Sequence, residues 1–91
     1  MVSVKLCEGL FGKVSVMHAD TKEILWEGKS GQKAEFEVAE DTPVWFIWGI
    51  LQTPNLNETV KKDGNYELIF RMKPFKSEYS LIDLDEPYEE V

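Results

Sequence analysis

The sequence predicts an all-β fold, an antiparallel sandwich of seven to eight short strands, either Ig-like or prealbumin-like. Apolar and polar residues alternate along most of the chain, whereas apolar positions at helical spacing are almost absent. Clusters of Gly, Pro and Asp interrupt the alternation at the intervals of about 8–12 residues that are typical of sandwiches. The chain has 91 residues, which is enough for one domain.

The N-terminal half contains four predicted strands. Alternation marks residues 2–7, 13–18, 23–27 and 33–38, and the last of these has the cleanest pattern of a half-buried strand. Between them lie a Gly-bounded loop at residues 9–12, a turn at residues 19–22, and a second turn that glycines open and close at residues 28–31.

The C-terminal half begins with residues 44–51, which are apolar on both faces and predict a central strand. A weaker edge strand is expected at residues 56–60, followed by an Asp63-Gly64 pair of the kind that closes tight hairpins. Residues 66–73 and 78–84 complete the set. The predicted domain therefore covers residues 1–84, with an acidic flexible tail at residues 85–91.

The net charge of −7 is concentrated at the C-terminal end, because residues 77–91 carry six acidic side chains and no basic one. The basic residues form only two short clusters, at residues 61–62 and 71–73, so binding to nucleic acid is not expected. The acidic end is interpreted either as a solubilising segment or as a docking segment. In the second case its apolar anchors for a partner are Tyr79, Leu81, Ile82, Leu84 and Tyr88.

A single cysteine, Cys7, excludes an intramolecular disulfide and is typical of a reducing compartment. The first residues lack the pattern of a signal peptide, and the longest apolar run has eight residues, too few to span a bilayer. We therefore expect a cytoplasmic protein of bacterial style that has no membrane partner. One Cys and one His do not make a usual zinc site, and no cofactor is expected.

Residues 2–38 resemble small bacterial β-sandwich domains of the PEGA-like, prealbumin-like kind. The resemblance lies in Gly12-Lys-Val-Ser-Val16, Trp26-Glu-Gly28 and Gly31-Gln-Lys-Ala-Glu-Phe-Glu-Val38, with the turns between them. It implies an accessory or interaction domain without catalysis, and it brings no active-site residues with it.

Catalysis by a nucleophile would require Cys7 close to the only histidine, His18. If residues 2–7 and 13–18 form a hairpin, roughly 16 Å separates these two residues. We interpret Cys7 as a packed residue and His18 as a polar residue at a strand end. No enzyme activity is predicted.

The tryptophans raise the question of which face of residues 44–51 reaches solvent. Trp45 and Trp48 are three residues apart, so on a strand they project to opposite faces. In one interpretation, the tryptophan ring that projects away from the core is covered by the loop near Pro54 or by the segment around Phe75 and Tyr79. The other is an exposed ligand-binding patch of Trp45 with Trp26 or Tyr66.

Two functions follow from these patterns. The first is a non-catalytic domain that binds an unidentified protein. That protein can be a second copy of the chain, in a homo-oligomer that forms through an edge strand. The alternative is a small-ligand or carbohydrate-binding module that uses an exposed Trp/Tyr face.

Overall fold

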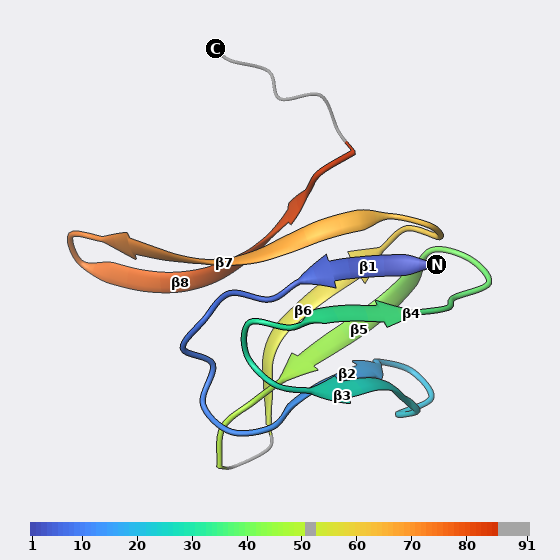
Figure 1. The fold of residues 1–91 in the computed structure, drawn as a ribbon, viewed down its shortest axis with the longest axis horizontal. Helices are drawn as coiled ribbons and strands as arrows, with labels where there is room; N and C mark the ends of the chain where they lie inside the picture. Colours follow the sequence, from blue (N-terminus) through green and yellow to red (C-terminus); the bar gives the residue numbers. More distant parts are fainter. Residues whose placement is uncertain (51–52, 86–91) are drawn as a thin grey trace.

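The computed structural model describes residues 1–50 and 53–85, and their fold is a sandwich of two four-stranded sheets without a helix (Figure 1). The strands, in chain order, are β1 (Val2–Lys5), β2 (Val14–His18), β3 (Ile24–Gly28), β4 (Lys33–Phe36), β5 (Thr42–Ile47), β6 (Pro54–Val60), β7 (Asn65–Lys73) and β8 (Lys76–Asp83). The all-β class and the number of strands agree with the prediction. The predicted tail at residues 86–91 lies outside the described residues.

The two sheets have the strand orders β4-β1-β7-β8 and β3-β2-β5-β6. All neighbours are antiparallel except β1 and β7, which run parallel, with Val4 beside Tyr66. The prediction of an antiparallel sandwich therefore needs this one correction. A parallel pair needs a long connection, and here the rest of the chain from β2 to β6 supplies it.

The core lies between the sheets and consists mainly of alternating side chains from the inner strands. Val2 and Val4 of β1 face Val14 and Val16 of β2 across it, and Phe46 of β5 is fully buried. In β1 and β4 the buried apolar positions alternate with polar residues, so each of these strands has one core face. The core also includes Leu6, Leu10, Ala34, Phe36, Val44, Trp48, Val60, Tyr66 and Leu68.

Two expected hairpins are crossovers between the sheets. The loop at residues 6–13 joins β1 of one sheet to β2 of the other, and the Asp63-Gly64 turn joins β6 to β7 in the same way. Asp63 has a φ of 60°, a conformation that Asp tolerates better than most residues. The prediction of a tight hairpin here was wrong, because the Gly64 carbonyl accepts a hydrogen bond from Ser3 N–H and β1 occupies the place beside β7.

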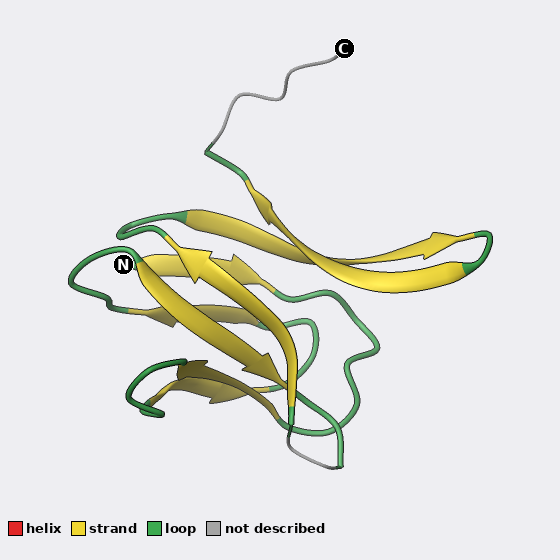
Figure 2. Ribbon diagram, turned by 180° about the vertical axis from the view of Figure 1, so that it is seen from behind, coloured by secondary structure: helices red, strands yellow, loops and turns green. Residues whose placement is uncertain are grey.

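The hairpin of β7 and β8 projects beyond the rest of the sandwich (Figures 1 and 2). β7 has nine residues, but only Asn65, Tyr66 and Glu67 pair with β1. Among the described strands, only β8 pairs with the part of β7 from Leu68 to Lys73, and β8 returns after a turn at Pro74 and Phe75. The far half of the hairpin therefore has one free edge on each side.

Candidate functional site

The three aromatic residues of the predicted ligand patch do not share a surface. Tyr66 is 5% exposed, and its hydroxyl accepts a hydrogen bond of 2.7 Å from Lys61 N–H. Burial raises the pKa of this phenol above its ordinary value of about 10. Tyr66 is therefore part of the core between β6 and β7.

Trp26 and Trp45 lie on opposite faces of one sheet. Trp26 is opposite Val16 and packs against the core, whereas Trp45 is opposite Met17 on the outer face. The ammonium of Lys22 lies 3.8 Å from the centroid of a Trp45 ring and makes a cation–π contact. The Trp45 ring on the outer face of β5 is therefore half-buried, and Lys22 lies over it. One interpretation expected Pro54, or Phe75 and Tyr79, in this place.

The predicted strand at residues 44–51 is shorter than expected. β5 ends at Ile47 after a register shift, and Trp48, which is 7% exposed, belongs to the core. In a strand over residues 44–51, Ile50 would share a face with Trp48, but it lies in the loop that follows β5 and is 83% exposed. Val44, Phe46 and Trp48 keep the period of two in the core, and the pattern fails only at Ile50, beyond the end of β5. The register shift adds its extra residue, Asn55, to β6.

Cys7 and His18 lie at opposite ends of the sandwich. Cys7 follows β1, its carbonyl accepts a hydrogen bond of 3.0 Å from the Ser30 hydroxyl, and burial raises the pKa of its thiol. His18 ends β2, where its Nδ1 accepts hydrogen bonds from the N–H groups of Asp20 and Thr21. Within the described residues, no three His, Cys, Asp or Glu side chains are grouped closely enough to hold a metal ion.

The predicted partner-binding residues lie on or just after β8. Tyr79 and Leu81 face inward and pack against the core, and the Tyr79 ring lies 4.8 Å from that of Trp48. Leu84 is 54% exposed, and Tyr88 lies outside the described residues. The strand that carries these residues therefore presents its backbone to solvent more than its apolar side chains.

β8 is the outermost strand of its sheet, and within residues 1–50 and 53–85 no strand pairs with its outer edge. The Leu84 N–H donates to the Asn65 carbonyl at 2.8 Å, which fixes the direction of the backbone groups. Because these directions alternate along a strand, the N–H and C=O groups of Ser77, Tyr79 and Leu81 point away from β7. They form a row of unpaired donors and acceptors.

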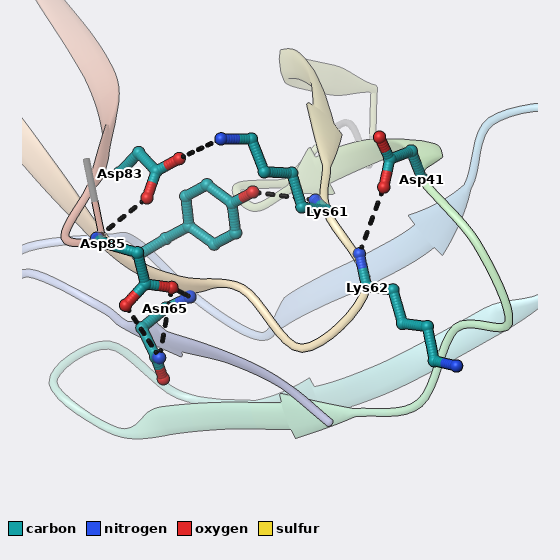
Figure 3. Close-up of polar contacts among 7 residues, drawn as sticks. Asp41, Lys61, Lys62, Asn65, Asp83 and Asp85 are labelled. Atoms are coloured by element: carbon teal, nitrogen blue, oxygen red, sulfur yellow. Dashed lines mark hydrogen bonds and ion pairs between the residues drawn. The ribbon is translucent and has the colours of Figure 1, made fainter.

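Polar contacts hold the C-terminal end of β8 in place (Figure 3). Lys61 Nζ lies 3.0 Å from Asp83 Oδ2, and the Asp85 carboxylate accepts a hydrogen bond of 3.0 Å from Asn65 N–H. The Asn65 amide also donates to Asp85, and Asp85 N–H donates to Asp83. The edge of β8 is thus a fixed feature at this end.

A second exposed surface lies at the end of the sandwich where β1, β5 and β7 finish. Parallel pairing brings the ends of β1 and β7 to one side, and the pairing of Ser15 with Ile47 brings the end of β5 there as well. We call this the loop end. It comprises residues 6–13, 29–32 and 48–50 and the outer part of the hairpin, residues 70–78.

Apolar side chains are exposed in three loops of the loop end. Phe11 is 67% exposed, Ile50 is 83% exposed and Phe75 is fully exposed. Gly49 N–H donates to the Phe11 carbonyl at 2.8 Å, so the first two loops are in contact. The loop end lies at the left and lower left of Figure 1, with the tip of the hairpin at its upper limit.

The inner face of the hairpin adds two more apolar side chains. Phe70 and Met72 continue the face of the buried Tyr66 and Leu68, but they are 45% and 83% exposed because the opposing sheet does not extend so far. Phe70 and Met72 were predicted to lie on a strand, but not to form an exposed apolar surface. The signal was present, since alternation continues in β7 beyond the residues that one opposing sheet can cover.

The two ends of the molecule carry opposite charge. Among the described side chains, the loop end has four basic residues, Lys13, Lys29, Arg71 and Lys76, against Glu8 and Glu78, and Glu27 of β3 forms an ion pair with Lys13. The connections at the opposite end, with Asp85, have seven acidic residues against three basic ones: Asp20, Glu23, Glu37, Glu40, Asp41, Asp63 and Asp85 against Lys22, Lys61 and Lys62. The apolar end of the sandwich is therefore also its basic end.

Comparisons with known proteins do not place the chain in a family: no family model, curated protein or solved structure matches it. The PEGA-like resemblance therefore stays a prediction. Among the described residues, no helix is long and apolar enough to cross a membrane.

Proposed function

We propose that the chain is a non-catalytic, cytoplasmic interaction domain that binds a protein partner along the free edge of β8. The observation that carries the proposal is the row of outward backbone groups at Ser77, Tyr79 and Leu81. A partner segment in extended conformation would pair with this row and add a strand to the sheet, a mode in which main-chain hydrogen bonds supply affinity.

The other sheet edges suit such pairing less well. β4 has only four residues, and β3 contains a register shift where it pairs with β2. β6 begins with Pro54, which has no N–H to donate. β8 has eight residues and is the longest of the four edge strands, and its outward backbone groups at Ser77, Tyr79 and Leu81 belong to uncharged residues.

The partner is either a different protein or a second copy of this chain. Two copies of β8 in antiparallel arrangement would place Ser77 of one opposite Leu81 of the other, if the pairing is centred on Tyr79, so that the outward backbone groups of the two strands face each other. Light scattering at increasing protein concentration distinguishes the two cases, because only a second copy raises the mass of the purified chain. The ligand-binding alternative loses its support, since Trp26, Trp45 and Tyr66 do not form one face.

Replacing Ser77 tests the proposal, because this side chain is exposed and its N–H points away from β7. Ser77→Pro removes one outward donor and leaves the β7–β8 hydrogen bonds intact, whereas Ser77→Ala keeps the donor. With the partner identified on the full chain as bait, we expect Ser77→Pro to bind about fivefold or more weakly and Ser77→Ala to bind normally. Equal binding of the two variants would contradict the proposal.

A chain that ends at Asp85 tests the contribution of the acidic end. It keeps the edge of β8 and the Asn65 contacts but lacks Tyr88. If Tyr88 is an anchor, as the sequence suggested, this chain recovers less partner than the full chain does. Equal recovery would remove residues 86–91 from the proposal and leave the strand edge as its only part.

A further inference from the structure

The loop end combines exposed apolar side chains with exposed basic side chains on a protein of net negative charge. Its exposed apolar side chains, Phe11, Ile50, Met72 and Phe75, come from three separate loops or strand ends. Arg71 and Lys76 lie beside Met72 and Phe75 on the hairpin and are themselves exposed. Apolar and basic side chains are thus interleaved at the most prominent part of the molecule.

We infer that the loop end is a site for peripheral binding to anionic phospholipid membranes, a function beyond the proposed protein interaction. Phe75, Ile50 and Phe11 would enter the boundary between headgroups and acyl chains. Arg71 and Lys29 would contact the lipid phosphates and carboxylates. Lys13 and Lys76, which form exposed ion pairs with Glu27 and Glu78, would exchange these partners for lipid groups. Proteins bind the membrane surface in this way when burial of apolar area is combined with attraction to anionic lipid.

The shape of the loop end favours a bilayer over a protein groove. The hairpin projects from the sandwich (Figure 2), and Phe75 at its turn is fully exposed. The loops that carry Ile50 and Phe11 contact each other and lie apart from the tip of the hairpin at the same end of the sandwich (Figure 1). A fluid bilayer accepts several separate apolar side chains without matching their shape, whereas a protein partner needs a complementary pocket for each of them.

The net charge of −7 does not oppose binding of the loop end to an anionic membrane, because the charge is unevenly distributed over the molecule. The acidic connections lie at the opposite end of a molecule whose longest extent is 36 Å. The screening length at physiological salt is only about 8 Å, so an anionic surface at the loop end interacts mainly with the local basic residues. The acidic end then repels the surface and orients the molecule with its hairpin toward the membrane.

Vesicle flotation tests the inference with a defined probe. Large unilamellar vesicles of phosphatidylcholine with about 30 mol% phosphatidylserine should bind the full chain, and vesicles of phosphatidylcholine alone should bind it at least tenfold more weakly. Raising NaCl from about 0.1 M to about 0.5 M should reduce binding to the anionic vesicles. Absence of binding to the anionic vesicles at low salt overturns the inference.

Matched substitutions locate the contact. Phe75→Ser should weaken vesicle binding about tenfold, whereas Ile24→Ser changes an apolar side chain that is 50% exposed on the opposite end and should leave binding unchanged. Arg71→Gln should weaken it about fivefold, and Lys62→Gln, at the acidic end, should not. Equal effects of the members of either pair would show that binding is not through the loop end and would overturn the assignment.

The proposed protein interaction at the edge of β8 and the membrane inference can be tested independently of each other. Phe75→Ser should weaken vesicle binding, and it should leave partner binding at the edge of β8 unchanged, because Phe75 precedes that strand. If vesicles do not bind and Phe75→Ser instead lowers recovery of a protein, the loop end is a protein-binding surface and the membrane inference is wrong. In that case the β8 edge proposal is still decided by Ser77→Pro and Ser77→Ala.

Discussion

Trp48 and Tyr79 meet edge to face, with their ring centroids 4.8 Å apart and their planes at 69°. Trp48 follows β5 in one sheet and Tyr79 belongs to β8 in the other, so this pair connects the sheets near the base of the projecting hairpin. Tyr79 also contacts Phe70 of β7, at 4.9 Å. The pair is therefore expected to set the position of the hairpin relative to the core.

Removal of the Tyr79 ring should destabilise the fold and free the hairpin. We expect Tyr79→Ala to lower the free energy of unfolding by about 2 kcal/mol, from lost burial and the lost ring pair. Tyr79→Phe keeps the ring and should cost less than about 1 kcal/mol. Urea titration followed by tryptophan fluorescence measures both values, and equal costs for the two variants would show that the ring contact does not matter.

Tyr66 should make stability depend on pH under alkaline conditions. Burial raises its pKa in the folded protein, so the folded state holds this proton more firmly than the unfolded state. Its contribution is fully present below the unfolded value of about 10 and is lost as the pH rises through the folded pKa. Tyr66→Phe should remove this dependence, at a cost of about 1 kcal/mol at neutral pH for the bond to Lys61 N–H. Thermal unfolding of both proteins between neutral and alkaline pH checks the prediction.

Gly28→Ala should displace the Trp26 ring. A Cβ at Gly28 would lie 2.4 Å from two atoms of that ring and 2.5 Å from Gln32 Oε1, which accepts a bond from Lys29 N–H. We expect a loss of stability of about 1–3 kcal/mol and a red shift of tryptophan emission. In a Trp26→Val background the same substitution should cost clearly less, because the ring that it meets is gone. An unchanged cost in that background would refute the clash.

The Cys7 thiol should react slowly. Burial raises its pKa, so at pH 8 a smaller fraction is thiolate than in an ordinary cysteine. Alkylation by iodoacetamide should be several-fold slower in the folded protein than in urea. Cys7→Ala should leave binding to the protein partner at the edge of β8 intact, because Cys7 is not part of that strand. Equal alkylation rates in the two states would show that burial does not protect the thiol.

The period-two pattern was sufficient to locate the strands but not to assign them to sheets. The turn at Asp63-Gly64 has the residues that reverse a chain sharply, and it does reverse the chain. Local chemistry does not determine whether the next strand pairs with the previous one, and here β1, some sixty positions earlier in the chain, takes that place. The same limit applied to residues 6–13, which also cross between the sheets.

The candidate surfaces were predictable only in part. Tyr79 and Leu81 were correctly associated with a strand near the C-terminal end, but their inward direction depends on pairing with Phe70 and Leu68. The loop end could not be found from net charge, because its basic residues are scattered between Lys13 and Lys76 and come together only through the topology.

The parallel pairing of β1 with β7 has a consequence for the order of folding. β1 is synthesised before the other strands, and its neighbour β7 follows some sixty residues later. Until β7 is synthesised, β1 has only β4 as a partner in its sheet. The sheet of β2, β3, β5 and β6 comes from residues 14–60 and can form before β7 exists. Contacts between positions so distant in the chain slow the final step. The sheet that contains β1 is therefore completed only after β7 has been synthesised and has paired with it.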